Sequence, residues 1–437
     1  MSIDKKLNKA LIASISGRYL VYVTQVISMV VMARLFTPEN FGIFAAVQVF
    51  AIFFTLLSEM GLGPALINQK TVNNEMRDGV FSLTLIIGAC LALIFGLSGS
   101  IISSFYDNEI YNLLVIPIAI SIIFNTTAIV PLASFQKDKR FISIARCEGI
   151  AELLSLGMVL IQIQYFEPIW VLSLKPLTVA ILRCFLLWIT SQKTFVGRAK
   201  FGRDLGQVRV LLAFSMYQFG FSVVNYFSRN LDNILVGKYF SSISLGVYDQ
   251  AYRLMRYPLM LLTFAMAPAI QPVLTELKDD PYEFERLHNK FVTFISILGL
   301  VVGISVYFLA DLIVSILLGE QWGDVIPLLE ILSLTIPIQI VLSSSGGFFQ
   351  AAGRADLLFK SGVLSTIVNV TAVIIGINHG TLEGLCWSLL VSFSINFIQT
   401  YFILSKYLLP NGFIHFLKKI SVSILGTAIF ITWAYTH

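Results

Sequence analysis

The chain has 437 residues, of which 57% are hydrophobic and 13% charged, and its formal net charge at neutral pH is +5. Soluble domains typically have an apolar share of about 45–50%, so this composition, with a mean hydropathy of +0.82, excludes a soluble globular protein. Because a helix needs roughly 20 apolar residues to cross the hydrocarbon core, we predict an all-α polytopic membrane protein.

Apolar stretches long enough to span a membrane follow one another along the whole chain. The first is interrupted by Arg18 and is not followed by an A-x-A cleavage site, so it is predicted to be a retained span rather than a signal peptide. Connections are short and leave no room for a separate soluble domain. The predicted spans lie near 10–33, 41–66, 80–104, 111–134, 146–165, 169–191, 208–236, 244–274, 291–316, 325–351, 358–378, 383–405 and 414–435.

Two stretches of the chain resemble each other at one fixed offset. Segments 33–44 and 237–248 align without a gap, so that Gly42 matches Gly246. The same register, carried on for a whole helix, matches 64–66 with 268–270. Repeats of this kind in a membrane chain indicate two homologous halves packed about a pseudo-symmetry axis, with the substrate path between them.

A second repeat, at a slightly different offset, matches Phe135 and Arg140 with Phe349 and Arg354. Together the repeats predict two related six-helix bundles and about one extra C-terminal helix. The predicted domains are an N-terminal transmembrane bundle at 1–191, a cytoplasmic linker at 192–207, a C-terminal transmembrane bundle at 208–405 and an additional transmembrane helix at 406–437.

Lysine and arginine are concentrated in one set of alternate loops. The opposite loops carry only Arg34 and Lys238 as basic residues, together with acids. The positive-inside rule therefore predicts a cytoplasmic N-terminus. The net positive charge is explained by loops that face anionic lipid headgroups. Basic and aromatic residues do not interleave on one exposed face, so no nucleic-acid partner is predicted.

Charged residues also occur inside the apolar spans, where each costs from about 2.5 kcal/mol and normally faces the bundle interior or a water-filled cavity. Glu148, Glu152 and Lys175 are expected near span ends, from which they reach the interface. The deeper group comprises Arg18, Glu59, Arg229, Asp232, Asp249, Arg253 and Arg256. Since these residues lie on spans related by the repeat, we expect them to line a cavity between the halves.

Two interpretations of the deeper group remain open. Arg229 with Asp232, and Asp249 with Arg253, have the spacing of internal ion pairs that fix helix packing. Arg18 and Arg256 have no obvious local partner, and a surplus of guanidinium groups favours an anionic ligand, especially phosphate. We therefore predict Arg18, Arg229, Arg253 and Arg256 as the phosphate-binding residues and Glu59, Asp232 and Asp249 as candidates to accept a coupling proton.

No catalytic residue or metal site is predicted. The four cysteines (Cys90, Cys147, Cys184 and Cys386) fall inside apolar runs without metal-ligand spacing, and are interpreted as buried small apolar residues. Outer loops are a few residues long and contain no DxD motif, which disfavours an enzyme such as a polysaccharide polymerase or a glycosyltransferase.

Four short motifs, in the right order over nearly the whole chain, resemble a known family. They read RLFTPENFGIF at 34–44, EMGLGPALI at 59–67, LLGEQW at 317–322 and QAAGR at 350–354. The chain is similar in these motifs to the polysaccharide transporter family, the Wzx-type O-antigen and exopolysaccharide flippases of the multidrug/oligosaccharidyl-lipid/polysaccharide exporter superfamily.

The resemblance implies a multi-pass protein of the bacterial cytoplasmic (inner) membrane. It implies two bundles that open alternately and carry an undecaprenyl-pyrophosphate-linked oligosaccharide to the periplasmic leaflet for O-antigen, capsule or exopolysaccharide synthesis. The arginines would then meet the pyrophosphate, and H⁺ or Na⁺ would couple transport without another cofactor. Implied partners are the lipid-linked oligosaccharide, membrane lipids, and the polysaccharide polymerase and chain-length machinery. The alternative is a multidrug/cation antiporter of the same superfamily, whose mostly cationic substrates favour an acidic cavity.

Overall fold

The computed structural model describes residues 3–59, 62–69, 72–202, 226–227, 229–277 and 280–436, and describes only the backbone at 3–16, 18, 68, 263–273 and 276. Within these ranges the chain is almost entirely helical and contains no strand. The predicted all-α fold class is confirmed. Each predicted span is helical except 208–236, which lies mostly outside the described residues.

Contacts divide the chain into two compact units, which we call unit 1 (Met1–Gly246) and unit 2 (Val247–His437). The predicted bundles at 1–191 and 208–405 stay a prediction, because the helix that would begin the second bundle is largely outside the described ranges.

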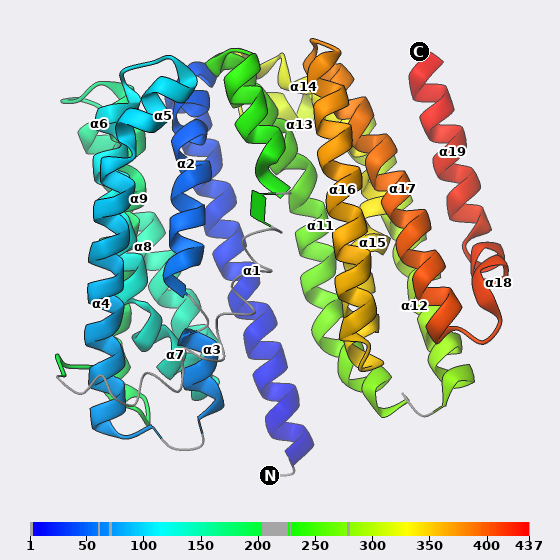
Figure 1. Cartoon of the computed structure of the whole chain (residues 1–437), viewed down its shortest axis with the longest axis horizontal. Helices are drawn as coiled ribbons and strands as arrows, with labels where there is room; N and C mark the ends of the chain where they lie inside the picture. Colours follow the sequence, from blue (N-terminus) through cyan, green and yellow to red (C-terminus); the bar gives the residue numbers. More distant parts are fainter. Residues whose placement is uncertain are drawn as a thin grey trace. The chain divides into compact units, whose positions relative to one another are not determined.

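Unit 1 is built around α6, which packs against α4, α2 and α9, while α1 packs on α8 (Figure 1). A helical segment at 229–239 follows the linker region. The other elements are α1 (Ile3–Leu35), α2 (Pro38–Glu59), α3 (Leu62–Asn68), α4 (Asn74–Leu97), α5 (Gly99–Tyr106), α6 (Tyr111–Thr127), α7 (Ile129–Lys137), α8 (Phe141–Gln162), α9 (Pro168–Thr190) and the 3₁₀ turn η1 (Ser191–Lys193).

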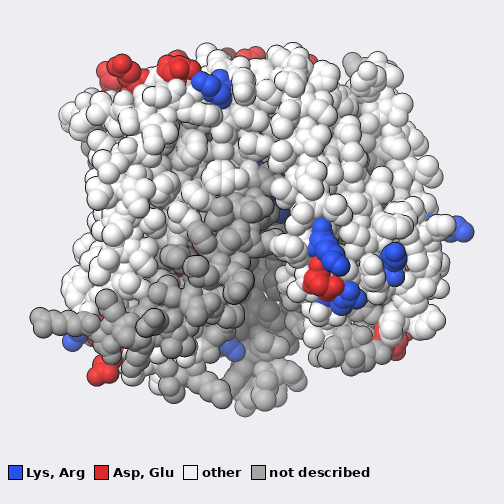
Figure 2. All heavy atoms as spheres, in the orientation of Figure 1, with Lys and Arg blue, Asp and Glu red and all other residues white. Residues whose placement is uncertain are grey.

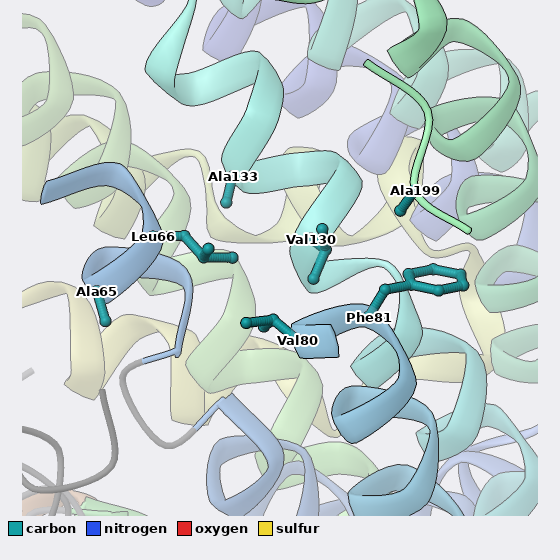
Figure 3. Close-up of a cluster of buried hydrophobic side chains, with 7 residues drawn as sticks. All are labelled: Ala65, Leu66, Val80, Phe81, Val130, Ala133 and Ala199. Atoms are coloured by element: carbon teal, nitrogen blue, oxygen red, sulfur yellow. The ribbon is translucent and has the colours of Figure 1, made fainter. Parts of the chain in front are cut away.

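The first part of the predicted linker is a packed segment of unit 1. Ala199 joins a buried cluster with side chains of α3, α4 and α7 (Figure 3). The indole of Trp188 donates to the Ala199 carbonyl at 2.9 Å, and Arg77 donates to the Val196 carbonyl at 2.7 Å. Asp78 accepts from the Lys200 N–H at 2.9 Å. These bonds satisfy an irregular backbone that would otherwise be costly to bury.

Unit 2 is organised around α12, which packs on α15, α14 and α19, and α17, which packs on α16 and α15. Its first helix, α11, begins at the end of unit 1. The elements are α11 (Ser242–Glu276), α12 (Pro281–Phe308), α13 (Ala310–Leu317), the 3₁₀ turn η2 (Glu320–Trp322), α14 (Val325–Ser333), α15 (Ile336–Ala351), α16 (Ala355–Asn378), α17 (Leu382–Leu408), α18 (Gly412–Lys419) and α19 (Ser421–Thr436).

Seven helices of the described ranges are long and apolar enough to cross a membrane, or up to nine if each of two bent pairs is one span. In unit 1, the face drawn in Figure 2 carries charged side chains at its upper and lower edges and few between them. The predicted span at 414–435 is bent, because α18 and α19 meet at 68°, and the predicted span at 325–351 is bent by 58° between α14 and α15. A helix of 16 residues such as α19 is shorter than the roughly 20 residues that span a bilayer.

The second repeat ends two helices with the same turn. After α7, Lys139 has a φ of 57°, and the Arg140 N–H donates to the Phe135 carbonyl at 3.0 Å. After α15, Gly353 has a φ of 70°, and the Arg354 N–H donates to the Phe349 carbonyl at 2.8 Å. This is the Schellman cap, which needs one left-handed residue. The sequence match between these segments therefore reflects a shared local structure.

Candidate functional site: charged side chains within the helices

Charged side chains of unit 1 pair between α8 and α9. The Lys175 Nζ lies 2.6 Å from Glu152 Oε1, and the Arg183 Nη2 lies 2.9 Å from Glu148 Oε1. All four side chains are 14–27% exposed. The expectation that Glu152 lies near a span end is wrong, because it lies in the middle of α8, whereas Lys175 lies in the first third of α9, where it was expected. Pairing lowers the cost of placing these charges within spans.

Glu59 is the last residue of α2 and lies within the stretch Pro38–Ile67, which is long and apolar enough to span a membrane. It interacts electrostatically with Arg183, so it belongs to the surroundings of the α8–α9 ion pairs. Its role in ion coupling stays a prediction.

Arg229 and Asp232 do not form an ion pair with each other in the described part of the chain. Arg229 is exposed, and no described side chain pairs with it. Asp232 is buried, and its Oδ1 accepts from the Asn233 N–H at 2.9 Å. The predicted ion pair between these two residues is therefore wrong.

Asp249 and Arg253 do form the predicted pair on α11. The Arg253 Nε lies 2.8 Å from Asp249 Oδ2, with side chains 41% and 12% exposed. The two atoms are close but are not aligned as a hydrogen bond, and among the described residues Oδ2 has no hydrogen-bond partner. The guanidinium therefore keeps much of its donor capacity.

Arg256 is one turn further along the same face of α11. Its side chain is exposed, and no described residue pairs with it. The helix packs through another side, where Ala251 and Met255 are fully buried and the Met255 sulfur lies 3.5 Å from Gln339 Nε2 of α15. Arg253 and Arg256 thus lie together on a side of α11 that the interior of unit 2 does not cover. The side chain of Arg18, the remaining predicted phosphate ligand, is outside the described residues.

Sequence reasoning missed Gln250, which is fully buried on α11 between Asp249 and Ala251. Among the described residues, neither its amide oxygen nor its amide nitrogen has a hydrogen-bond partner. A buried amide without partners is costly, which makes it a candidate to bind a polar group. In the sequence this residue is an amide directly after Asp249 on a predicted span, and nothing in the local pattern predicts its burial.

The described residues contain no group of three or more His, Cys, Asp or Glu side chains that could hold a metal ion. Cys147, Cys184 and Cys386 are buried as predicted, whereas Cys90 is exposed, which corrects its assignment to the interior.

Residues 31–327 match a protein family described as "polysaccharide biosynthesis protein". The chain is 22% identical over 381 residues to the teichuronic acid biosynthesis protein TuaB of Bacillus subtilis, which covers 86% of this chain and 77% of that protein. It is 22% identical over 392 residues to the lipopolysaccharide biosynthesis protein WzxC of Escherichia coli, which covers 89% of this chain and 78% of that protein.

Among solved structures, the lipid II flippase MurJ in an inward closed conformation has the same fold. The TM-score is 0.73 at 16% identity, and the match covers 96% of this chain and 98% of that chain. The matched family covers more than half of the residues, and the all-helical membrane fold agrees over nearly the whole length. The chain therefore belongs to the polysaccharide biosynthesis protein family and has the fold of a multi-pass membrane transporter.

Proposed function

We propose that this protein is a flippase that moves undecaprenyl-pyrophosphate-linked oligosaccharide repeat units across the bacterial inner membrane, for O-antigen, capsule or exopolysaccharide synthesis. One observation carries the proposal: a chain of the polysaccharide biosynthesis protein family matches the fold of a lipid II flippase over 96% of its length. The relatives named for teichuronic acid and lipopolysaccharide synthesis support a role in surface polymers.

In this proposal the headgroup crosses by alternating access while the lipid tail stays in the bilayer. Arg256 and Arg253 grip the pyrophosphate, and Arg229 and Arg18 assist. The exposure of Arg256 without a partner among the described side chains supports this role, because a planar guanidinium can bind phosphate through two parallel hydrogen bonds. Asp249, Asp232 and Glu59 are the candidates for coupling to H⁺ or Na⁺. The N-terminus lies in the cytoplasm, and the polymerase and chain-length machinery take up the product.

The proposal is tested first in a host strain from which this gene is deleted. Lipid-linked oligosaccharide and surface polysaccharide are quantified together in the same cells. Loss of the polymer with accumulation of complete lipid-linked repeat units is expected. Unchanged glycolipid and polymer, with altered sensitivity to cationic drugs, would instead identify a multidrug antiporter.

The residue assignment is tested by complementing that strain with Arg256→Ala. Surface polymer should fall at least tenfold at unchanged membrane expression, because a phosphate contact worth about 1.5–3 kcal/mol is removed. Arg256→Lys should keep part of the activity, since it retains the charge without the bidentate geometry. Arg146→Ala is the matched control, because Arg146 is also exposed and lies on α8. Wild-type export by Arg256→Ala would remove this residue from the site.

A further inference from the structure

Unit 2 contains a basic pocket that is separate from the charges of α11. It has a volume of about 460 Å³ and lies between the first turns of α12 and the short helix α18. On α12 it is lined by Tyr282, Arg286, Asn289 and Lys290, and on α18 by His415 and Lys419. The spacing of these residues places each set on one helical face.

The carboxylate of this pocket, Glu285, accepts hydrogen bonds from neighbouring residues of the protein. Glu285 is 2% exposed, and its Oε2 accepts from the backbone N–H of Asn411 at 3.0 Å and from the Asn411 side chain at 3.1 Å. Its Oε1 accepts from Asn289 at 3.4 Å. The carboxylate therefore forms the floor that ties the start of α18 to α12, and it does not face the opening.

The lysine and arginine side chains of the pocket are exposed. Arg286 pairs at 2.8 Å with Glu283, and the arginine side chain is 73% exposed. Lys290 and Lys419 are exposed, and the described residues offer neither ammonium group a hydrogen-bond or ion-pair partner. The imidazole of His415 also belongs to the lining. A pocket with this charge balance favours an anion with several acceptor oxygens.

The surroundings of the pocket have the character of a membrane interface. α12, which begins at Pro281, is long and apolar enough to cross a membrane, and α18 meets α19 at 68°. α18 buries Phe416, exposes 72% of Ile414 and ends in Lys418 and Lys419. A short helix with an apolar side and a basic end is typical of a helix that lies in the headgroup region. Figure 2 shows basic side chains on the outer side of unit 2 at the level of α18. The basic residues at the start of α12 and in α18 belong to the set that the positive-inside rule places in the cytoplasm.

We propose that this pocket binds the phosphate of an anionic phospholipid headgroup from the cytoplasmic leaflet. Lys290 and Lys419 bind the phosphate oxygens, with Arg286 and Asn289 as further donors. The exposed Ile414 and Tyr282 lie beside the acyl chains. A site for a soluble phosphate would not need these exposed apolar side chains. The lipid is a resident ligand that holds α18 against α12, and it is not the transported substrate. This inference does not depend on the proposed transport function.

The test uses the full-length protein purified in a neutral detergent. Binding of phosphatidylglycerol and phosphatidylcholine, each labelled on an acyl chain, is measured by fluorescence anisotropy. The wild type should bind phosphatidylglycerol at least about tenfold more tightly. The double variant Lys290→Gln/Lys419→Gln should lose about tenfold or more of that affinity and keep its affinity for phosphatidylcholine, because each lysine near an anionic lipid contributes separately.

Two matched variants separate the pocket from general surface charge. Lys360→Gln/Lys406→Gln removes two exposed lysines of α16 and α17 that do not line the pocket, and should bind as the wild type does. Lys290→Arg/Lys419→Arg keeps the charges and should keep the preference. Equal wild-type affinity for the two lipids, or an equal loss in the control variant, would overturn the proposal. Displacement of the labelled lipid by millimolar inorganic phosphate or pyrophosphate would overturn it in favour of a soluble anion.

Discussion

Gly42 and Gly246, which occupy equivalent positions in the first sequence repeat, pack against each other's helical turn. A Cβ on Gly42 would lie 1.6 Å from the Ser242 carbonyl oxygen, and a Cβ on Gly246 would lie 1.9 Å from the Pro38 carbonyl oxygen. Pro38 and Ser242 are themselves equivalent in the repeat. The contact is therefore reciprocal, as in an interface with two-fold symmetry. Both partners belong to unit 1, where α2 begins and α11 starts.

Gly42→Ala or Gly246→Ala should each lower the melting temperature and the export activity. Neither backbone carbonyl can move aside as a flexible side chain would, so the two turns must separate, at a cost of about 1–3 kcal/mol or more. Thermal unfolding of the purified protein measures this effect. Gly347→Ala on α15 is the control, since a Cβ there meets nothing within 4 Å and alanine is the better helix former. If the Gly42→Ala protein has the same melting temperature as the wild type, the turns are not tightly packed.

Lys139→Gly should stabilise the protein by about 0.5–1 kcal/mol, because glycine adopts a left-handed conformation without the steric cost that lysine meets at a φ of 57°. The structural equivalent in the other repeat, Gly353, already has glycine at a φ of 70°. Gly353→Ala should accordingly lose about 1 kcal/mol. Chemical or thermal unfolding of both variants tests the pair, and shifts of the same sign would contradict the shared Schellman cap.

Glu152→Gln should destabilise unit 1, because it leaves the Lys175 ammonium unpaired within a span. Loss of one partner of a fully buried pair costs about 3–5 kcal/mol. Here the side chains are 14–18% exposed, so we expect about 1–3 kcal/mol. The double variant Glu152→Leu/Lys175→Met should recover most of this loss. Glu283→Gln, at an exposed pair, is the control and should change stability by less than about 1 kcal/mol. If Glu152→Gln changes stability no more than this control does, the α8–α9 pair has no structural role.

Breaking the pair of Asp249 with Arg253, by Asp249→Asn or Arg253→Gln, should change stability little, whereas loss of the Arg253 guanidinium should reduce transport strongly. The Arg253 side chain is 41% exposed, so breaking its pair with Asp249 should cost only about 0–1 kcal/mol in stability. Export by Arg253→Gln should fall at least tenfold if the guanidinium binds substrate phosphate. A double-mutant cycle, with melting temperature and surface polymer as separate readouts, tests this division. Equal, small effects on both readouts would leave the pair with a packing role alone.

Hydropathy alone predicted the helices, because partition of an apolar stretch into hydrocarbon depends on the stretch itself and little on its neighbours. It did not predict the bend at 414–435, where α18 and α19 meet at 68°. The Lys418-Lys419 pair at that bend carries a basic signal in the sequence, but the direction in which the next helix leaves is decided by packing on α12.

The sequence by itself predicted the local ion pair of Asp249 with Arg253, since residues four apart lie on one face of a helix, whereas the pair that the spacing of Arg229 and Asp232 also allowed does not form. Only the tertiary structure decided the pairs of Lys175 with Glu152 and of Arg183 with Glu148, because each joins two helices. The same holds for Glu285, which looks like an ordinary surface acid until Asn411, 126 positions later, covers it. Residue spacing predicts which contacts within one helix are possible, whereas contacts between helices depend on how the helices pack.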